Sequence, residues 1–578
     1  MPQFRRLLAA LADVRRIATP YFYGEDRWAG RLLLLSVIGL ELSIVALNVL
    51  FNSWNARFYN AIEAKDWESF KFELLLFCGL AALFIAAAVY QLYLQLWLRI
   101  RWRQWMTERY LVRWLREGTH YRMRVTGDVA DNPDQRIAED LELFAERAIT
   151  IGIGFLGAIA TLVSFVTILW RLSNDAATPY LSAVPGYLVW IAMFYAIGGT
   201  LITHLIGHPL VRLNFNQQRY EADFRYHLVR IRENGEQVAL LAGENAERAR
   251  LGDRFATLVA NFRRIMTARK RLTWFTAGYD QVSIVFPYVV VSPAFFAGTI
   301  PLGVLTQTAS AFGQVQTAFS FFVNAYSQLA EWRAVTERLI GFEDSMQQAE
   351  RMKASSQIVL SENPKVALSI NELKLRLPSG VPIVSADDVV IAPDESVLVT
   401  GRSGSGKSTL FRAIAGIWPF GSGKIALGKG TILMVLPQRP YLPFGRLDEA
   451  LAYPNPPTAF SATQLAEVLN AVRLEKLVPR LDEEASWPHV LSQGEQQRIS
   501  LARAILSKPN VLLLDESTSA LDETAETELY QLLESRLPGA TIISIGHRQT
   551  LHPLHQRRLH LEPAGDMYQL RPAKIGAD

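Results

Sequence analysis

Residues 401–409 read Gly-Arg-Ser-Gly-Ser-Gly-Lys-Ser-Thr, a spacing of small residues, lysine and hydroxyls that suits phosphate binding. Small residues let consecutive backbone N–H groups curl around phosphate oxygens, a lysine meets the β- and γ-phosphate charges, and a hydroxyl reaches Mg²⁺. Lys407 and Ser408 occupy those two positions. The predicted nucleotide-binding loop consists of Gly401, Arg402, Ser403, Gly404, Ser405, Gly406, Lys407, Ser408 and Thr409. The alternative is a glycine-rich turn without a ligand.

The residues around this loop predict the elements that position it. Residues 396–400 are typical of a strand that enters the loop, and residues 410–414 of a helix whose N-terminus faces the phosphates. A second buried strand is predicted at residues 511–514, and it ends at Asp515 and Glu516. Asp515 suits a Mg²⁺ ligand, and Glu516 suits a base or water-orienting group for in-line attack on the γ-phosphate.

Four more motifs stand at compatible spacings. Leu-Ser-Gln-Gly-Glu-Gln-Gln-Arg (491–498) precedes the second strand, Ser-Ala-Leu-Asp (519–522) follows it, and a single His547 comes after the apolar run 541–545. Gln438, in Leu-Pro-Gln-Arg-Pro, lies between the phosphate loop and residue 491. Together these motifs resemble the signature sequence, D-loop, switch histidine and Q-loop glutamine of the ATP-binding-cassette (ABC) ATPases.

In that family two cassettes dimerise head to tail. The resemblance therefore implies that Ser492, Gln493 and Gly494 of one copy face the γ-phosphate that Lys407 binds in the other. Gln493 stands where glycine is usual, so Ser492 and Gly494 are the safer assignments. Because the chain carries one cassette, the expected working unit is a homodimer, with a heterodimer as the open alternative.

The same resemblance assigns the cofactors ATP and Mg²⁺. It implies Ser408, Gln438 and Asp515 as Mg²⁺ ligands, and catalytic roles for Glu516, Gln438 and His547, of which His547 contacts the γ-phosphate. It also places Asp522 of the D-loop at the nucleotide.

One position departs from the family pattern. ABC cassettes stack adenine on an aromatic residue upstream of the phosphate loop, whereas residues 361–400 contain no aromatic residue. Arg376 or Leu377 occupies the place. We therefore expect weak base recognition, in which GTP competes well with ATP.

The composition predicts a membrane half and a soluble half. The chain has 578 residues, a net charge of +4 and a mean hydropathy of +0.12. Several apolar runs in the first 330 residues are long enough to cross a bilayer, which takes about 20 residues. The arginines between these runs reflect membrane topology rather than nucleic-acid binding, so no nucleic-acid partner is expected. The single cysteine, Cys78, excludes a disulfide within the chain.

Six spans and their orientation follow from these runs. Arginine-rich loops after the second and fourth runs, against an acidic first loop, place both termini in the cytoplasm. We expect the spans to continue as cytoplasmic helices, and residues 4–23 to form an interfacial helix or, alternatively, an ordinary amphipathic one. The predicted spans are residues 31–53, 74–98, 149–170, 184–206, 279–300 and 305–328.

Four segments resemble the SbmA/BacA-like ABC transporters and the related peroxisomal acyl-CoA (subfamily D) transporters. These segments are residues 52–59, 132–137, 232–244 and 487–498. The resemblance implies an exporter-type helical transmembrane domain fused to an α/β P-loop cassette. The predicted domains are 1–345 for the membrane, 346–365 for a linker and 366–578 for the cassette, and the expected location is the cell inner membrane.

Glu41 lies near the middle of the first predicted span, where a carboxylate costs roughly 2.5–3.5 kcal/mol on insertion scales. Such a group faces a cavity or a partner. Substrate contact, proton coupling and a structural hydrogen bond are the open alternatives.

These observations predict an ATP-driven transporter that takes up bulky hydrophilic cargo such as peptides or cobalamin. One alternative is an exporter of lipid, fatty acyl-CoA or amphipathic compounds. Another, from a different class, is an ATP-gated channel or regulatory membrane subunit. The expected partners are a second copy of the chain, the lipid bilayer and the transported small molecule or peptide.

Overall fold

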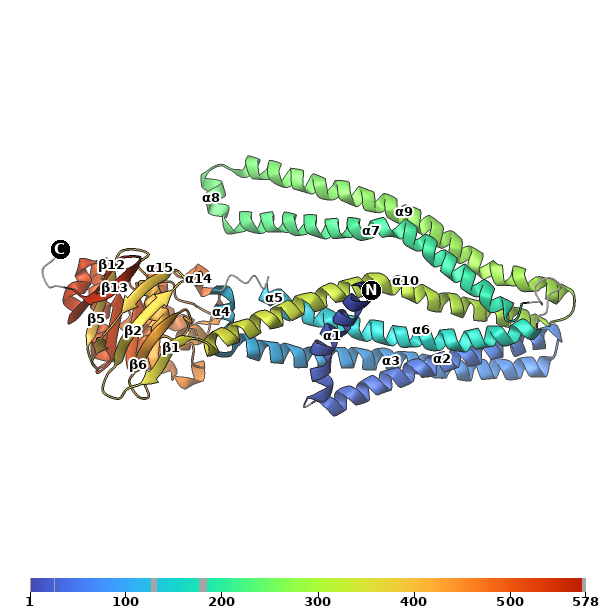
Figure 1. Cartoon of the computed structure of the whole chain (residues 1–578), viewed down its shortest axis with the longest axis horizontal. Coiled ribbons are helices and arrows are strands. Elements are labelled where there is room, and N and C mark those ends of the chain that lie inside the picture. Colours follow the sequence, from blue (N-terminus) through green and yellow to red (C-terminus); the bar gives the residue numbers. More distant parts are fainter. Residues whose placement is uncertain (1, 25, 126–131, 176–183, 574–578) are drawn as a thin grey trace. The chain divides into compact units, whose positions relative to one another are not determined.

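A computed structural model describes residues 2–24, 26–125, 132–175 and 184–573 (Figure 1). The chain divides into two compact units. Unit 1, the membrane unit, consists of residues 1–111 and 132–342, and unit 2, the cassette unit, of residues 112–131 and 343–578.

The membrane unit is helical. Its helices are α1 (Pro2–Tyr23), α2 (Arg27–Glu63), α3 (Trp67–Leu115), α5 (Pro133–Gln135), the π-helical turn η2 (Arg136–Asp140), α6 (Leu141–Asp175), α7 (Tyr187–Glu233), α8 (Gly235–Leu240), α9 (Glu244–Phe296) and α10 (Leu302–Ala354). Helices α3 and α10 run on into the residues of the cassette unit. The lengths of α3, α7, α9 and α10 exceed what a bilayer requires, as the predicted cytoplasmic extensions imply.

In the part of the chain that the structure describes, four helical segments are long and apolar enough to cross a membrane. They run over residues 27–63, 67–125, 133–174 and 187–233, and they contain the first four predicted spans except for residues 184–186. The fifth predicted span lies on α9 except for residues 297–300, and the sixth lies on α10; both helices are less apolar than the first four spans. The six-span topology and the orientation of the termini stay predictions.

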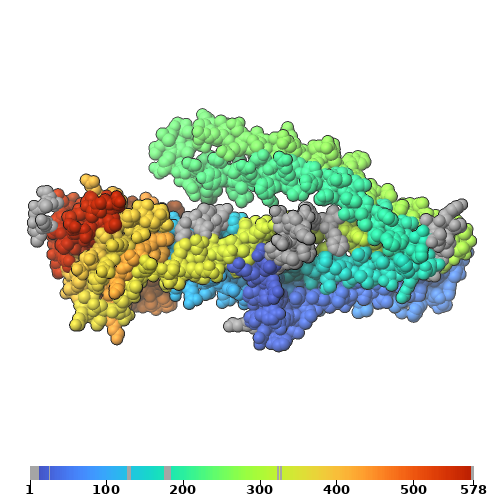
Figure 2. All heavy atoms as spheres, viewed as in Figure 1, coloured from blue at the N-terminus to red at the C-terminus, as the bar shows by residue number. Residues whose placement is uncertain are grey.

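Helices α7 and α9 pack along each other, and their atoms adjoin in the space-filling view (Figure 2). The Tyr195 hydroxyl donates to the Tyr279 carbonyl oxygen at 2.8 Å, and the Tyr279 hydroxyl donates to the Tyr195 carbonyl oxygen at 3.1 Å. The two rings stack with centroids 4.6 Å apart. Gly199 is needed opposite them because a Cβ there would overlap the Tyr279 ring. This reciprocal pair fixes the register of α7 against α9.

The segment near Pro133 begins a helix. Asn132 occupies the N-cap position with a φ of 56°, but its side chain makes no capping hydrogen bond, and Asp131 lies outside the described residues. Further along the same helical segment, the buried Asp140 carboxylate accepts hydrogen bonds from Arg136 at 2.6 Å and from Arg338 of α10 at 2.9 and 2.5 Å. This ion triad ties η2 to α10.

The cassette unit is built on a mixed sheet in the order β1-β6-β2-β3-β13-β12-β5-β11-β10-β7, with β4 paired to β2. The strands are β1 (Gln357–Glu362), β2 (Leu368–Arg376), β3 (Pro382–Ala386), β4 (Val389–Ile391), β5 (Ser396–Gly401), β6 (Gly421–Leu427), β7 (Leu433–Leu436), β10 (Val511–Asp515), β11 (Thr541–Ile545), β12 (Arg557–Ala564) and β13 (Met567–Pro572). A second, two-stranded sheet pairs β8 (Gly445–Arg446) with β9 (Glu484–Ala485). The parallel strands β5, β11, β10 and β7 include both strands predicted from the sequence.

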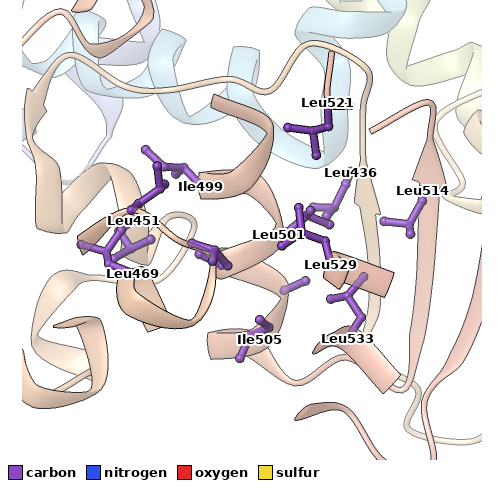
Figure 3. Close-up of a cluster of buried hydrophobic side chains, with 14 of the residues drawn as sticks. Leu436, Leu451, Leu469, Ile499, Leu501, Ile505, Leu514, Leu521, Leu529 and Leu533 are labelled. Carbon is purple, nitrogen blue, oxygen red and sulfur yellow. The ribbon is translucent and has the colours of Figure 1, made fainter. Parts of the chain in front are cut away.

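Helices cover this sheet. They are α11 (Lys407–Ile414), α12 (Leu447–Ala452), η3 (Pro457–Ala459), α13 (Ala462–Ala471), η4 (Glu475–Arg480), α14 (Trp487–Val490), α15 (Gln493–Ser507), α16 (Glu523–Arg536) and η5 (Gln549–Leu554). Along β10, Leu512 and Leu514 enter one core with Leu501 and Leu529 (Figure 3). Val511 and Leu513 enter a second core on the other face, as the alternation of a strand requires.

The short stretch 112–125 completes the cassette unit. It contains the turn η1 (Arg116–Gly118) and α4 (Thr119–Val125), and Val125 packs against the second core. The buried Arg122 guanidinium donates to the Ala349 carbonyl oxygen at 3.0 Å, and Arg113 donates to both Glu350 carboxylate oxygens at 2.7 and 2.9 Å. The Arg113 guanidinium holds the pKa of Glu350 below its usual value.

Residues 346–365, predicted as a linker, contain regular structure. Helix α10 continues to Ala354, and β1 pairs with β6 in parallel over six residues. The polar composition of this stretch reflects exposed faces of a helix and an edge strand.

Candidate active site

The phosphate loop joins β5 to α11, as predicted. Gly404 and Gly406 have φ values of 79° and 90°, which favour glycine. A Cβ at Gly406 would also stand 2.5 Å from Val384 Cγ2 and 2.8 Å from Ile383 Cγ2, so β3 leaves no room for a side chain. The loop therefore exposes backbone N–H groups at the start of α11, where an anion is favoured.

Lys407 is 6% exposed, and its ammonium group lies inside the loop. It donates to the carbonyl oxygens of Gly401 and Arg402 at 2.8 and 2.9 Å. Burial lowers its pKa, and the nearby carboxylates Glu516 and Asp515 oppose that shift. A partly desolvated cation in this position is suited to a phosphate charge.

Ser408 and Asp515 come together although they lie 107 residues apart. The Ser408 hydroxyl donates to Asp515 Oδ1 at 3.0 Å. Burial raises the pKa of Asp515, and this hydrogen bond opposes the shift. A hydroxyl and a carboxylate beside a phosphate loop form the oxygen-rich donor set that Mg²⁺ prefers, so these residues fit the ion.

Glu516 stands at the end of β10, and its carboxylate is bonded from two sides. Gln438 Nε2 donates to Glu516 Oε2 at 2.9 Å, and His547 Nε2 lies 3.0 Å from Glu516 Oε1. Glu516 has a φ of 50°, a conformation that costs a non-glycine residue free energy and that occurs often at active sites. Its N–H donates to the Ile545 carbonyl oxygen at 3.1 Å, which anchors the turn to β11.

These residues line one hollow of about 650 Å³. Of the residues predicted from the sequence, it is lined by Ser403, Gly404, Gly406, Lys407, Ser408, Thr409, Gln438, Asp515, Glu516 and His547. Gly401 and Arg402 lie behind Lys407, and Ser405 is fully buried.

The signature residues do not line this hollow in the described chain. Ser492 is the N-cap of α15, and its hydroxyl accepts from the Glu495 N–H at 3.3 Å, while Gln493 and Gly494 form the first turn. Asp522 is the N-cap of α16 and accepts from the Ala525 N–H at 2.7 Å. Within one copy, these four residues act as helix starts.

Sequence reasoning missed part of the wall of the hollow. The residues missed are Ile383, Arg412, Pro437 and Arg439. Of the two candidates for the place of the aromatic residue, Arg376 and Leu377, Leu377 lines the hollow. Arg376 is fixed by its backbone, which accepts a hydrogen bond from Trp418 Nε1 at 3.0 Å.

Glu41 lies on α2 of the membrane unit. Gln91 of α3 donates a hydrogen bond to its carboxylate. Gly157 of α6 is needed beside it, because a Cβ there would overlap the carboxylate. Glu41 thus sits where α2, α3 and α6 approach each other, and its role in transport stays a prediction.

Comparison with known proteins agrees with this architecture. The family model of ABC transporter transmembrane region 2 matches residues 17–296, and that of the ABC transporter ATPase matches residues 385–519. ABC transporter D family member 2, chloroplastic, of Arabidopsis thaliana is 34% identical, covering 95% of this chain and 86% of its own. The inner membrane ABC transporter ATP-binding protein YddA of Escherichia coli is 32% identical, covering 92% of this chain and 93% of its own.

A more distant relative is the human lysosomal cobalamin transporter ABCD4, which is 27% identical over 90% of this chain and 89% of its own. In fold, the chain is similar to a bacterial Atm1-family ABC exporter solved with ATP bound. That likeness has a TM-score of 0.69 at 16% identity and covers 92% of this chain and 93% of the exporter chain. The chain therefore belongs to the ABC transporters that fuse a transmembrane region to an ATPase cassette, is related to their subfamily D, and couples ATP hydrolysis to transport.

Proposed function

We propose that Glu516 prepares the water that attacks the γ-phosphate of ATP. The observation that carries this proposal is the double anchoring of its carboxylate by Gln438 and His547, at 2.9 and 3.0 Å. A carboxylate held in one orientation at the mouth of a phosphate loop is placed to accept a proton or orient a nucleophile. His547 is also close enough to the hollow to contact the γ-phosphate.

The remaining groups bind the nucleotide. Lys407 and the loop N–H groups neutralise phosphate charge. Ser408 and Asp515, with Gln438, would hold Mg²⁺, which supplies charge neutralisation at the β- and γ-phosphates. Water attacks the γ-phosphorus as the bond to the β-phosphate oxygen breaks, and ADP leaves with that electron pair.

The working unit that we propose is a head-to-tail homodimer. This proposal is supported by the positions of the nucleotide-binding motifs within one copy. The phosphate loop and Glu516 line one hollow, whereas Ser492, Gly494 and Asp522 lie outside it in the same copy. A two-fold dimer brings the second set to the first in both sites at once.

For the cargo, we propose uptake of a bulky hydrophilic molecule of the cobalamin class across the cell inner membrane. The human relative is named a cobalamin transporter, and the bacterial relative is named an inner membrane protein. Four segments also resemble the SbmA/BacA-like transporters, which supports the same cargo class.

Transport in proteoliposomes whose cassettes face outward tests direction and cargo together. Vesicles preloaded with labelled cobalamin or a proline-rich peptide should lose it when ATP is added, because uptake into a cell is movement toward the cassettes. Vesicles containing Glu516→Gln should bind ATP and retain their cargo. ATP-driven accumulation inside the vesicles would establish export instead, and movement of acyl-CoA alone would replace the proposed cargo.

A further inference from the structure

Gln497 is a buried glutamine of α15 that lies in the signature segment 491–498 but has no role assigned to it there. Its side chain is 1% exposed and makes three hydrogen bonds. Nε2 donates to the Gln438 carbonyl oxygen at 3.1 Å and to Ser519 Oγ at 3.2 Å, and Oε1 accepts from the Ala520 N–H at 2.9 Å. Both amide protons and the amide oxygen are therefore used, and these partners fix the orientation of the amide.

The partners of Gln497 belong to two loops that leave neighbouring strands. Gln438 follows β7, while Ser519 and Ala520 follow Glu516 after β10. The Ser519 N–H donates to the Glu516 carbonyl oxygen at 3.1 Å. One amide thus joins the loop of Gln438 to the loop of Glu516, from a helix whose first residues are the signature.

A second side chain extends this network. Arg548, directly after His547, donates to the carbonyl oxygens of Leu521 at 2.7 Å and Ser519 at 3.0 Å. The loop at 519–521 is therefore held on one side by Gln497 and on the other by the residue that follows His547. The loops that carry Gln438, Glu516 and His547 therefore share one hydrogen-bonded frame.

We propose that Gln497 is a positioning residue for hydrolysis: it holds the Gln438 loop and the 519–520 loop at the distance at which Gln438 binds the Glu516 carboxylate. It thereby ties helix α15, which starts at the signature, to the hydrolytic carboxylate of its own chain. This inference rests on the proposed role of Glu516. Removing the amide releases both loops, so Gln438 and Glu516 lose their alignment while the phosphate loop is untouched.

The test is the ATPase activity of the full-length protein with Gln497→Leu, which removes the amide at similar volume. We expect kcat to fall about tenfold, the effect of losing about one hydrogen bond of alignment, with KM for ATP changed less than about twofold. Gln497→Glu keeps the length of the side chain but lacks both donors. This variant should show the same fall in kcat with little change in KM, and it replaces the leucine variant in the test if that variant does not fold.

A double-mutant cycle separates positioning from stability. Because Gln497 acts through the Gln438 side chain, Gln497→Leu should cost nothing further in a Gln438→Ala background. The matched control is Gln496→Leu. The Gln496 side chain donates to the Pro488 and Leu491 carbonyl oxygens rather than to the loops of Gln438 and Ser519, so its effect should add to that of Gln438→Ala.

Additive effects of Gln497→Leu and Gln438→Ala would overturn the proposal, as would a rise in KM with kcat unchanged. Neither result would bear on Glu516, whose role is tested by Glu516→Gln alone. If Glu516→Gln kept the normal rate, the proposed function would fail first, and the origin of any Gln497 effect would lie elsewhere.

Discussion

The wall of the nucleotide hollow beside the phosphate loop presents Leu377 and Ile383, two aliphatic side chains. Among the described residues that line the hollow, none is Phe, Tyr or Trp. An aliphatic wall contacts any purine by dispersion, whereas an aromatic ring adds about 0.5–1.5 kcal/mol of stacking. Base discrimination is therefore expected to be weak.

Leu377→Tyr should create the missing stack. We expect KM for ATP to fall several-fold, and GTP to compete less well for ATP hydrolysis than it does in the unchanged protein. Competition assays at low concentrations of both nucleotides measure this. Arg376→Tyr is the control, since that residue does not line the hollow, and an equal effect of both variants would contradict the assignment of Leu377.

The buried His555 is expected to make the cassette less stable in acid. Its Nε2 and Nδ1 lie 2.8 Å from Ser544 Oγ and the Leu551 carbonyl oxygen, and burial lowers its pKa below the usual 6.5. The unfolded chain then takes up the proton more readily than the native one. Burying His555 in its neutral form therefore adds to the free energy of unfolding above about pH 6.5, and this stabilisation is lost as the pH falls toward the pKa of His555 in the native protein.

His555→Gln removes the titrating group and keeps an amide for Ser544. The thermal unfolding midpoint of this variant should fall less between pH 7.5 and pH 5.5 than that of the unchanged protein. The unfolding midpoint is measured by the intrinsic fluorescence of the protein in detergent. An identical fall in both proteins would show that other groups cause the acid sensitivity.

The sequence predicts the residues of the hollow that belong to motifs, because their spacing reflects chemistry. It does not predict which of Arg376 and Leu377 lines the hollow. The register between β2 and β3 shifts between Leu375 and Arg376, and such an irregularity changes the side to which each following residue points. The three hydrogen bonds of Gln497 could not be predicted from the sequence either. They join the loops after β7 and β10, which are close together only because these two strands are neighbours in the sheet.

The sequence also predicts some helices and strands better than others. Apolar runs predicted β5 and β10, the apolar run 541–545 forms β11, and four apolar helices contain most of the first four predicted spans. The less apolar α9 and α10 carry the last two predicted spans, where polar residues such as Gln307 interrupt the pattern. In the structure Gln307 and Asn52 bond each other across α10 and α2, at 3.2 and 3.0 Å. Polar residues that pair between helices weaken a hydropathy signal without preventing the helix.

The Asp140 triad should stabilise the contact of η2 with α10. Asp140 is 1% exposed and forms an ion pair with the buried Arg136. Replacing the Asp140 carboxylate by a neutral amide would leave the Arg136 guanidinium without its ion-pair partner. Breaking a buried pair typically costs about 3 kcal/mol. Asp140→Asn should therefore lower the thermal unfolding midpoint of the membrane unit clearly.

The control for this change is Glu337→Gln on α10, next to Arg338, which breaks the exposed pair with Arg333 at 2.8 Å. Exposed pairs contribute about 0.3–0.5 kcal/mol at i,i+4 spacing, so this variant should unfold close to the unchanged protein. Equal midpoints for Asp140→Asn and Glu337→Gln would show that the triad adds no net stability.

Complementation between defective copies tests the proposed dimer. Lys407→Ala removes phosphate binding, and Ser492→Arg blocks the signature. Each variant alone should be inactive, because both sites of its homodimer are defective. In a head-to-tail heterodimer both defects fall in one site and leave the other intact, so co-expressing the two variants should restore part of the ATPase activity. No recovery, despite co-purification of two differently tagged copies, would contradict the head-to-tail arrangement.

The cassette unit is not continuous along the chain, since residues 112–131 belong to it together with residues 343–578. A ribosome synthesises Arg122 and Val125 long before their partners in the cassette exist, and the membrane helices between them are made in the meantime. Folding of the cassette must therefore wait for the translation of nearly the whole chain. A cassette expressed on its own from residue 343 would lack the side chain that covers part of its second core, so adding the 112–125 segment as a separate peptide should improve its solubility.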